Sequence, residues 1–156
     1  MLLLLPIMAW NWKFVNKLPR LYSAEYFEKD IPPFVSIGEN SLRLVVFILP
    51  AFMPLNGSDQ IQKLGLWLYF LGVSLYFVSW LAQIIFPQSS WSLSAPGFLA
   101  PAYTPLIWLA GIGLIGKTVY FPFPYQAWMY LLISTVFVGF HFSHALIVYL
   151  KNTRIS

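Results

Sequence analysis

The chain contains no cysteine, and this absence excludes disulfide bonds, catalytic thiolates and metal or cluster sites built on cysteine. Charge is also scarce: acidic and basic residues make up 9% of the 156 residues, whereas 59% are hydrophobic and 19% aromatic. A water-soluble domain of this size needs far more charge to cover its surface. No charged residue occurs from Leu64 to Gly116 or from Thr118 to Leu150. These two uncharged runs predict a membrane-embedded protein.

The hydrophobic runs predict an all-α integral membrane bundle of four transmembrane helices, which forms a single polytopic domain over residues 1–156. A helix that crosses the hydrocarbon core of roughly 30 Å needs about 20 residues. Runs of about that length are found at about 37–55, 61–86, 97–116 and 125–150.

The first of these spans must include charged residues. Its uncharged part, residues 44–55, is too short to cross a membrane, so the helix has to begin before Glu39 and Arg43. These two residues are four apart with the acid first, which is the favourable order for a helical ion pair. Pro50 and Pro54 are expected to kink or end this helix before a turn at Asn56-Gly57, and Pro105 is expected to disturb the third span.

Residues 1–35 are predicted to form an interfacial, cytoplasmic segment that precedes the first span. The apolar run at its start is too short to cross a membrane and lacks the basic start and cleavage site of a secretory signal. Tryptophans beside Lys13 and Lys17 favour a helix or hook at the lipid interface, and a fifth, short span is the alternative. Ser23 is placed to cap a short helix that Pro32-Pro33 would stop.

Glycines in the third span fit a G-x-G-x-x-G pattern from Gly111 to Gly116. A nucleotide site is not expected, because no strand precedes the pattern and no βαβ unit surrounds it. Ala110, Gly113 and Gly116 follow one helix ridge, so we expect this ridge to be a helix-contact face.

Spans two and four begin alike, with Trp67-Leu68-Tyr69 in one and Trp128-Met129-Tyr130 in the other. The same offset aligns Trp80 with His141 and Gln83 with His144. Spans one and three do not match at this offset. The pattern suggests a duplicated helix hairpin.

Basic residues indicate the orientation of the bundle. Seven of the nine lysines and arginines flank the end that would carry both termini, so the N and C termini are expected to be cytoplasmic. So few basic residues give no reason to expect nucleic acid as a partner. The expected partners are the lipid bilayer and either further copies of the chain or the other subunits of a membrane complex.

The two histidines of the chain, His141 and His144, lie one turn apart in the last span and share a helix face. Ionisable side chains inside a membrane are costly and mark functional sites by default. The topology places polar residues of every span in the same cytoplasmic half. We therefore predict a cytoplasm-facing polar pocket that binds a ligand through His141, His144, Arg43, Glu39, Gln83, Tyr103 and Thr104.

The predicted pocket favours binding or transport of a small or amphiphilic solute, and a protonatable histidine could link this to protons. One alternative is a membrane enzyme or cofactor-binding protein that acts on a lipid-like or quinone-like substrate through His141 and His144. Another is an accessory subunit of a complex, in which the histidines only join helices, and Arg43 and Glu39 only reach headgroups. Two histidines with one glutamate are too sparse a set to predict a metal site, and the sequence identifies no cofactor.

Overall fold

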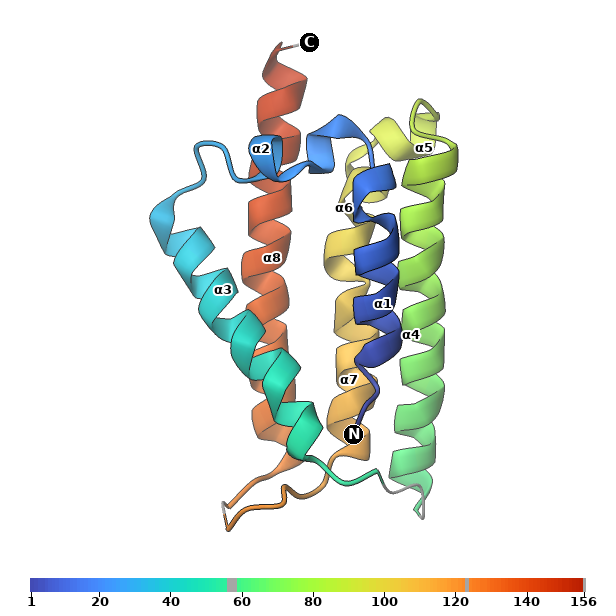
Figure 1. Cartoon of the computed structure of the whole chain (residues 1–156), viewed down its shortest axis with the longest axis vertical. Coiled ribbons are helices and arrows are strands. Elements are labelled where there is room, and N and C mark those ends of the chain that lie inside the picture. Colours follow the sequence, from blue (N-terminus) through green and yellow to red (C-terminus); the bar gives the residue numbers. More distant parts are fainter. Residues whose placement is uncertain (56–58, 123, 156) are drawn as a thin grey trace.

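The computed structural model describes residues 1–55, 59–122 and 124–155, and its long helices stand side by side as a bundle (Figure 1). Within these residues, four helical stretches are long and apolar enough to cross a membrane, so the predicted all-α membrane bundle is confirmed. Each begins and ends within a few residues of its predicted span. They are α3 (Pro33–Ile48) with the 3-10 turn η3 (Leu49–Phe52), α4 (Gln60–Ile85), α6 (Ala95–Tyr103) with α7 (Pro105–Ile115), and α8 (Ala127–Ile155).

Proline decides where several of these helices begin and end. Pro33 occupies the first turn of α3, where the missing N–H has no intrahelical partner to lose. As predicted, α3 gives way to a 3-10 turn that contains Pro50. Pro105 likewise opens α7, and Thr104 stands at the break after α6. The predicted turn at Asn56-Gly57 falls outside the described residues.

The first fourteen residues differ from the expected helix or hook at the lipid interface. Helix α1 (Leu5–Phe14) instead stands upright beside α4 and α7 (Figure 1), and Ile7 on it is only 1% exposed. The Tyr69 hydroxyl of α4 donates a hydrogen bond to the Leu3 carbonyl at 2.6 Å. Apolar side chains occur on every face of α1, so Ile7 packs into the bundle while Leu5, Met8 and Trp12 remain exposed.

Residues 15–32, which we call the strap, run from α1 to α3 across one end of the bundle, the strap end (Figure 1). Ser23 occupies the N-cap of α2, as predicted, but its side chain makes no capping hydrogen bond. Pro32, the last residue of the strap, is the N-cap of α3, and Pro33 is the first residue of that helix. The strap contains η1 (Val15–Lys17), η2 (Arg20–Tyr22) and α2 (Ala24–Phe27), and the short helix α5 (Ser90–Leu93) lies at the same end between α4 and α6.

Glycines bring the backbones of α4 and α7 into contact. A Cβ atom on Gly111 of α7 would lie 2.5 Å from the backbone nitrogen of Tyr69 and 2.6 Å from the carbonyl oxygen of Gly65. A Cβ atom on Gly72 of α4 would lie 2.4 Å from the backbone nitrogen of Trp108. Small residues permit such close approach between membrane helices.

The predicted contact ridge of Ala110, Gly113 and Gly116 is divided between different neighbours. A Cβ atom on Gly113 would lie 2.7 Å from Leu131 of α8, and one on Gly116 would lie 2.4 Å from Met53. The helix-contact interpretation is therefore confirmed for Gly113, whereas Gly116 meets Met53, which follows the 3-10 turn η3. The prediction missed Gly111, which makes the closest approach to α4.

We predict that Gly111→Ala destabilises the bundle by about 1–3 kcal/mol, because the new methyl group would meet backbone atoms that have no room to move. Gly139→Ala is the matched control, since a Cβ atom there has nothing within 4 Å. Alanine favours a helix interior over glycine, so Gly139→Ala should be neutral or stabilising. Thermal unfolding in detergent micelles measures both changes, and equal effects would contradict the backbone contact described here.

Candidate functional site

The carboxylate of Glu39, in the second turn of α3, is the centre of the site and is 2% exposed. Its oxygen Oε1 lies 2.9 Å from Nδ1 of His141, and Oε2 lies 2.5 Å from Nδ1 of His144. Both imidazoles reach one carboxylate because they lie three residues apart on the same face of α8. Arg43, one turn further along α3, also pairs with Oε1. We call these four residues the polar cluster.

His144 lies between two hydrogen-bond acceptors. Its Nδ1 faces the carboxylate of Glu39, and its Nε2 lies 2.8 Å from the carbonyl oxygen of Phe27 in the strap. A neutral imidazole has one N–H and can donate to only one of the two. Both bonds form together only when a further proton sits on the ring or on the facing carboxylate oxygen. In this geometry Glu39 and His144 therefore share one proton, and their combined charge is zero.

The strap is fixed to the bundle at three places, one of which is the polar cluster. At the first, the ring of Phe27 stacks on His144 with 4.6 Å between centroids, beside the hydrogen bond just described. At the second, the Tyr22 hydroxyl donates to the Phe98 carbonyl of α6 at 2.7 Å, and burial raises the pKa of this phenol. At the third, Nζ of Lys151 donates to the Asp30 carbonyl at 2.6 Å.

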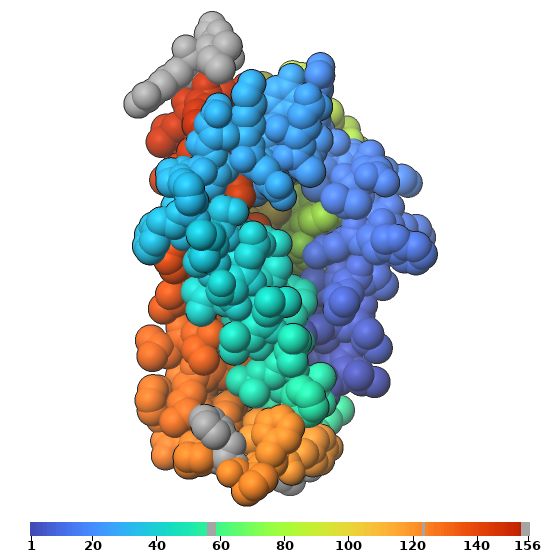
Figure 2. All heavy atoms as spheres, turned by 60° about the vertical axis from the view of Figure 1, so that its left-hand side comes forward, coloured from blue at the N-terminus to red at the C-terminus, as the bar shows by residue number. Residues whose placement is uncertain are grey.

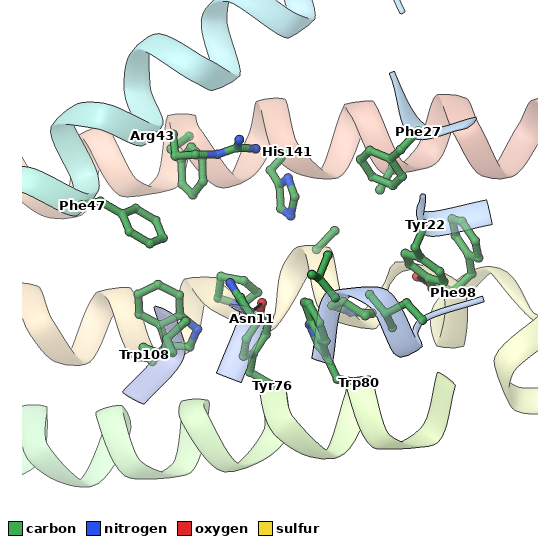
Figure 3. Close-up of a pocket in the computed structure, with 18 residues that line it drawn as sticks. Asn11, Tyr22, Phe27, Arg43, Phe47, Tyr76, Trp80, Phe98, Trp108 and His141 are labelled. Atoms are coloured by element: carbon green, nitrogen blue, oxygen red, sulfur yellow. Dashed lines mark hydrogen bonds between the residues drawn. The ribbon is translucent and has the colours of Figure 1, made fainter. Parts of the chain in front are cut away.

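A cavity of about 320 Å³ lies beneath the strap, beside the polar cluster. Figure 2 shows the surface hollowed between α3, the strap and α1, with atoms of α4 and α8 visible deep in the hollow. Arg43 and His141 form one wall of the cavity, and Tyr76, Trp80 and Trp108 lie opposite them (Figure 3). The hollow is on the side of the bundle, where lipid chains surround a membrane-embedded protein.

The aromatic wall also carries polar groups. The Tyr76 hydroxyl donates to Oδ1 of Asn11 in α1 at 2.8 Å, and the amide nitrogen of Asn11 has no hydrogen bond within the described residues. In Figure 3 this nitrogen points toward the wall formed by Arg43 and His141. The buried indole nitrogen of Trp108 also lacks a partner in the described part of the chain. Hydrogen-bonding groups thus face each other across a mainly aromatic space.

Two imidazoles and a carboxylate are ligand types found in many divalent-metal sites. Here each imidazole directs Nδ1 at a different oxygen of Glu39, so the ring nitrogens nearest the carboxylate are engaged with it. Within the described residues, no group of three histidine, aspartate or glutamate side chains is arranged to hold a metal ion.

The structure brings together four of the seven predicted site residues and leaves the other three elsewhere. Gln83, Tyr103 and Thr104 line neither the polar cluster nor the cavity beside it. The side chains of Gln83 and Tyr103 fasten the start of α6, and that of Thr104 bonds within its own helix. They donate to the carbonyls of Gly97 at 2.9 Å, Pro96 at 3.2 Å and Ala100 at 2.7 Å, respectively.

Sequence reasoning missed the residues of the aromatic wall and the role of the strap. Asn11 carried a signal, because it is a polar residue within an apolar run. The offset that aligns Trp80 with His141 carried another, since these two residues line the cavity from opposite sides. The backbone carbonyl of Phe27 carried none, because every residue has one.

We predict that Glu39→Gln lowers stability by about 3 kcal/mol or more, because it leaves Arg43 without a carboxylate and gives the histidines only one acceptor oxygen. It should also loosen the strap, since His144 holds the Phe27 carbonyl only when suitably protonated and oriented. Trypsin should then cut faster after Arg20 and Lys29 at temperatures below unfolding. Glu25→Gln in the exposed part of the strap is the control. A Glu39→Gln protein as stable and as resistant as this control would refute the central role of Glu39.

No family model matches the chain, and neither a curated protein nor a solved structure matches it. The geometry of the polar cluster and of the cavity therefore carries the functional proposal.

Proposed function

We propose that the protein binds an amphiphilic small molecule in the cavity beneath the strap, with the polar end of the molecule at Arg43 and His141. The observation that supports this most directly is the contrast between the cavity walls, one carrying charge and the other aromatic rings. Small-molecule sites typically combine an apolar lining with a few polar groups that fix orientation. A cavity of about 320 Å³ is at the lower end of the usual range of such sites, so it suits one chain or one ring system.

The polar cluster gives the proposed site a rigid wall. The two histidines are held by Glu39, which is itself held by Arg43, so the side chains that would meet a ligand are already in place. A site whose groups are fixed before binding loses less conformational entropy when the ligand arrives. Polar networks of this kind inside a membrane are costly to maintain, which favours a functional role over a purely structural one.

The opening of the cavity favours a ligand that comes from the membrane. The hollow in Figure 2 lies on the side of the bundle, between α3 and α1, whereas the strap covers the end. The excess of basic residues at the strap end favours placing that end in the cytoplasm. The site would then lie in the cytoplasmic half of the bilayer and draw its ligand from the neighbouring leaflet.

The test uses a photoreactive long-chain fatty acid and the matching photoreactive alcohol, each added to the protein in lipid nanodiscs. We expect at least one of the two to label residues of the cavity walls. Ala102→Leu should reduce this labelling several-fold, because Ala102 lines the cavity and a larger side chain would fill it. Ala9→Leu, at an exposed position of α1, is the matched control and should leave labelling unchanged.

Peptide mapping of the adducts distinguishes the cavity from the lipid-facing surface. If both probes label only exposed positions, or label the Ala102→Leu protein as strongly as the unaltered one, the proposed site is wrong. A complex that loses a subunit when His141 is replaced, with no labelling of the cavity, would instead favour the accessory role.

A further inference from the structure

The guanidinium of Arg43 has no carboxylate of its own in the polar cluster. Glu39 and His144 share a proton and together are neutral, and Nδ1 of His141 lies 2.9 Å from the same carboxylate. The guanidinium of Arg43 is always charged at accessible pH. It pairs with a carboxylate whose charge His144 also balances, so one positive charge is left over in the wall of the cavity.

Charge without a counter-ion is unfavourable in an apolar environment. No further acidic side chain lines the cavity within the described residues. The acids of the strap end, such as Glu25 and Glu28, are exposed on the strap and lie outside the cavity walls. The charge of the cluster is therefore not balanced by the cavity wall.

The hydrogen-bonding groups of the cavity are also unbalanced, with more free donors than acceptors. Arg43 uses its guanidinium on Glu39 and on Oδ1 of Asn40 at 3.2 Å, which leaves other N–H groups without a partner in the described chain. Across the cavity, the amide nitrogen of Asn11 is a second donor. The amide oxygen of the same side chain already accepts the hydrogen bond from Tyr76. A ligand head that fits between the two donors must supply acceptors on both sides.

We infer that the ligand is a single-chain carboxylate with one negative charge, an inference that rests on the binding function proposed above. A carboxylate has two acceptor oxygens and the one charge that the cluster lacks, and it suits the planar donors of arginine. Its chain lies along the aromatic wall toward the lateral opening. A phospholipid has two chains and a bulky head and is too large for this cavity, and a neutral quinone ring leaves the charge uncompensated.

The experiment compares the photoreactive fatty acid with its matching alcohol at neutral pH, using unlabelled hexadecanoate and its methyl ester as competitors. We expect hexadecanoate to compete about tenfold better than the ester, as a charge-assisted hydrogen bond should produce. Arg43→Gln should bring this ratio close to one while the ester still competes. Lys63→Gln, an exposed lysine at the start of α4, is the control and should keep the ratio of the unaltered protein.

The outcomes separate this inference from the proposed function. If acid and ester compete equally and both protect the cavity walls, the carboxylate inference is wrong but the binding site stands. If neither protects the walls, both fall. Stronger competition by hexadecyl phosphate than by hexadecanoate, or a preference for the acid that survives Arg43→Gln, would also overturn the inference.

Discussion

One carboxylate joins the first and last spans of this protein. Glu39 is buried in α3 and forms hydrogen bonds with two imidazoles of α8, while Arg43 pairs with it from the next turn. A buried carboxylate is tolerated only where such partners surround it. The contact therefore fixes the register and rotation of α3 against α8. It also links the strap to the bundle, because the outer nitrogen of His144 holds the Phe27 carbonyl.

The cavity follows from the way the helices share the remaining space. Glycines draw α4 and α7 together until their backbones touch, whereas at the contact of α3 with α8 the ring of Phe140 lies between the two backbones, against Gly38 and Phe34. The short helix α1 fills part of the space between these two pairs, and the strap closes one end of it (Figure 1). The hollow that is left borders the polar cluster on one side and the aromatic residues of α4 and α7 on the other. The charged side chain of Arg43 and the apolar surface of the aromatic residues thus border the same cavity.

The sequence was sufficient for the spans and for the polar cluster, because both depend on distance along a helix. Uncharged runs give span length, the short first run requires Glu39 inside the membrane, and the spacing of His141 and His144 gives them one face. It was insufficient wherever rotation about a helix axis decides the contact. Gln83 and Tyr103 were placed at the correct end of the bundle, yet they turn toward the start of α6. The upright position of α1 was missed because an apolar run of ten residues does not reveal what it packs against.

The three attachments of the strap make the two exits from the cavity unequal. By either route the proposed ligand must leave Arg43, but an exit between α3 and α1 breaks no hydrogen bond between the strap and the bundle. A molecule that leaves past the strap must first break hydrogen bonds at Tyr22 and Phe27, which join the strap to α6 and α8. On the proposed function, the barrier to exchange with the bilayer would therefore be lower than the barrier to exchange with water. The residence time of the proposed ligand would then follow the fluidity of the surrounding lipid more closely than the composition of the aqueous phase.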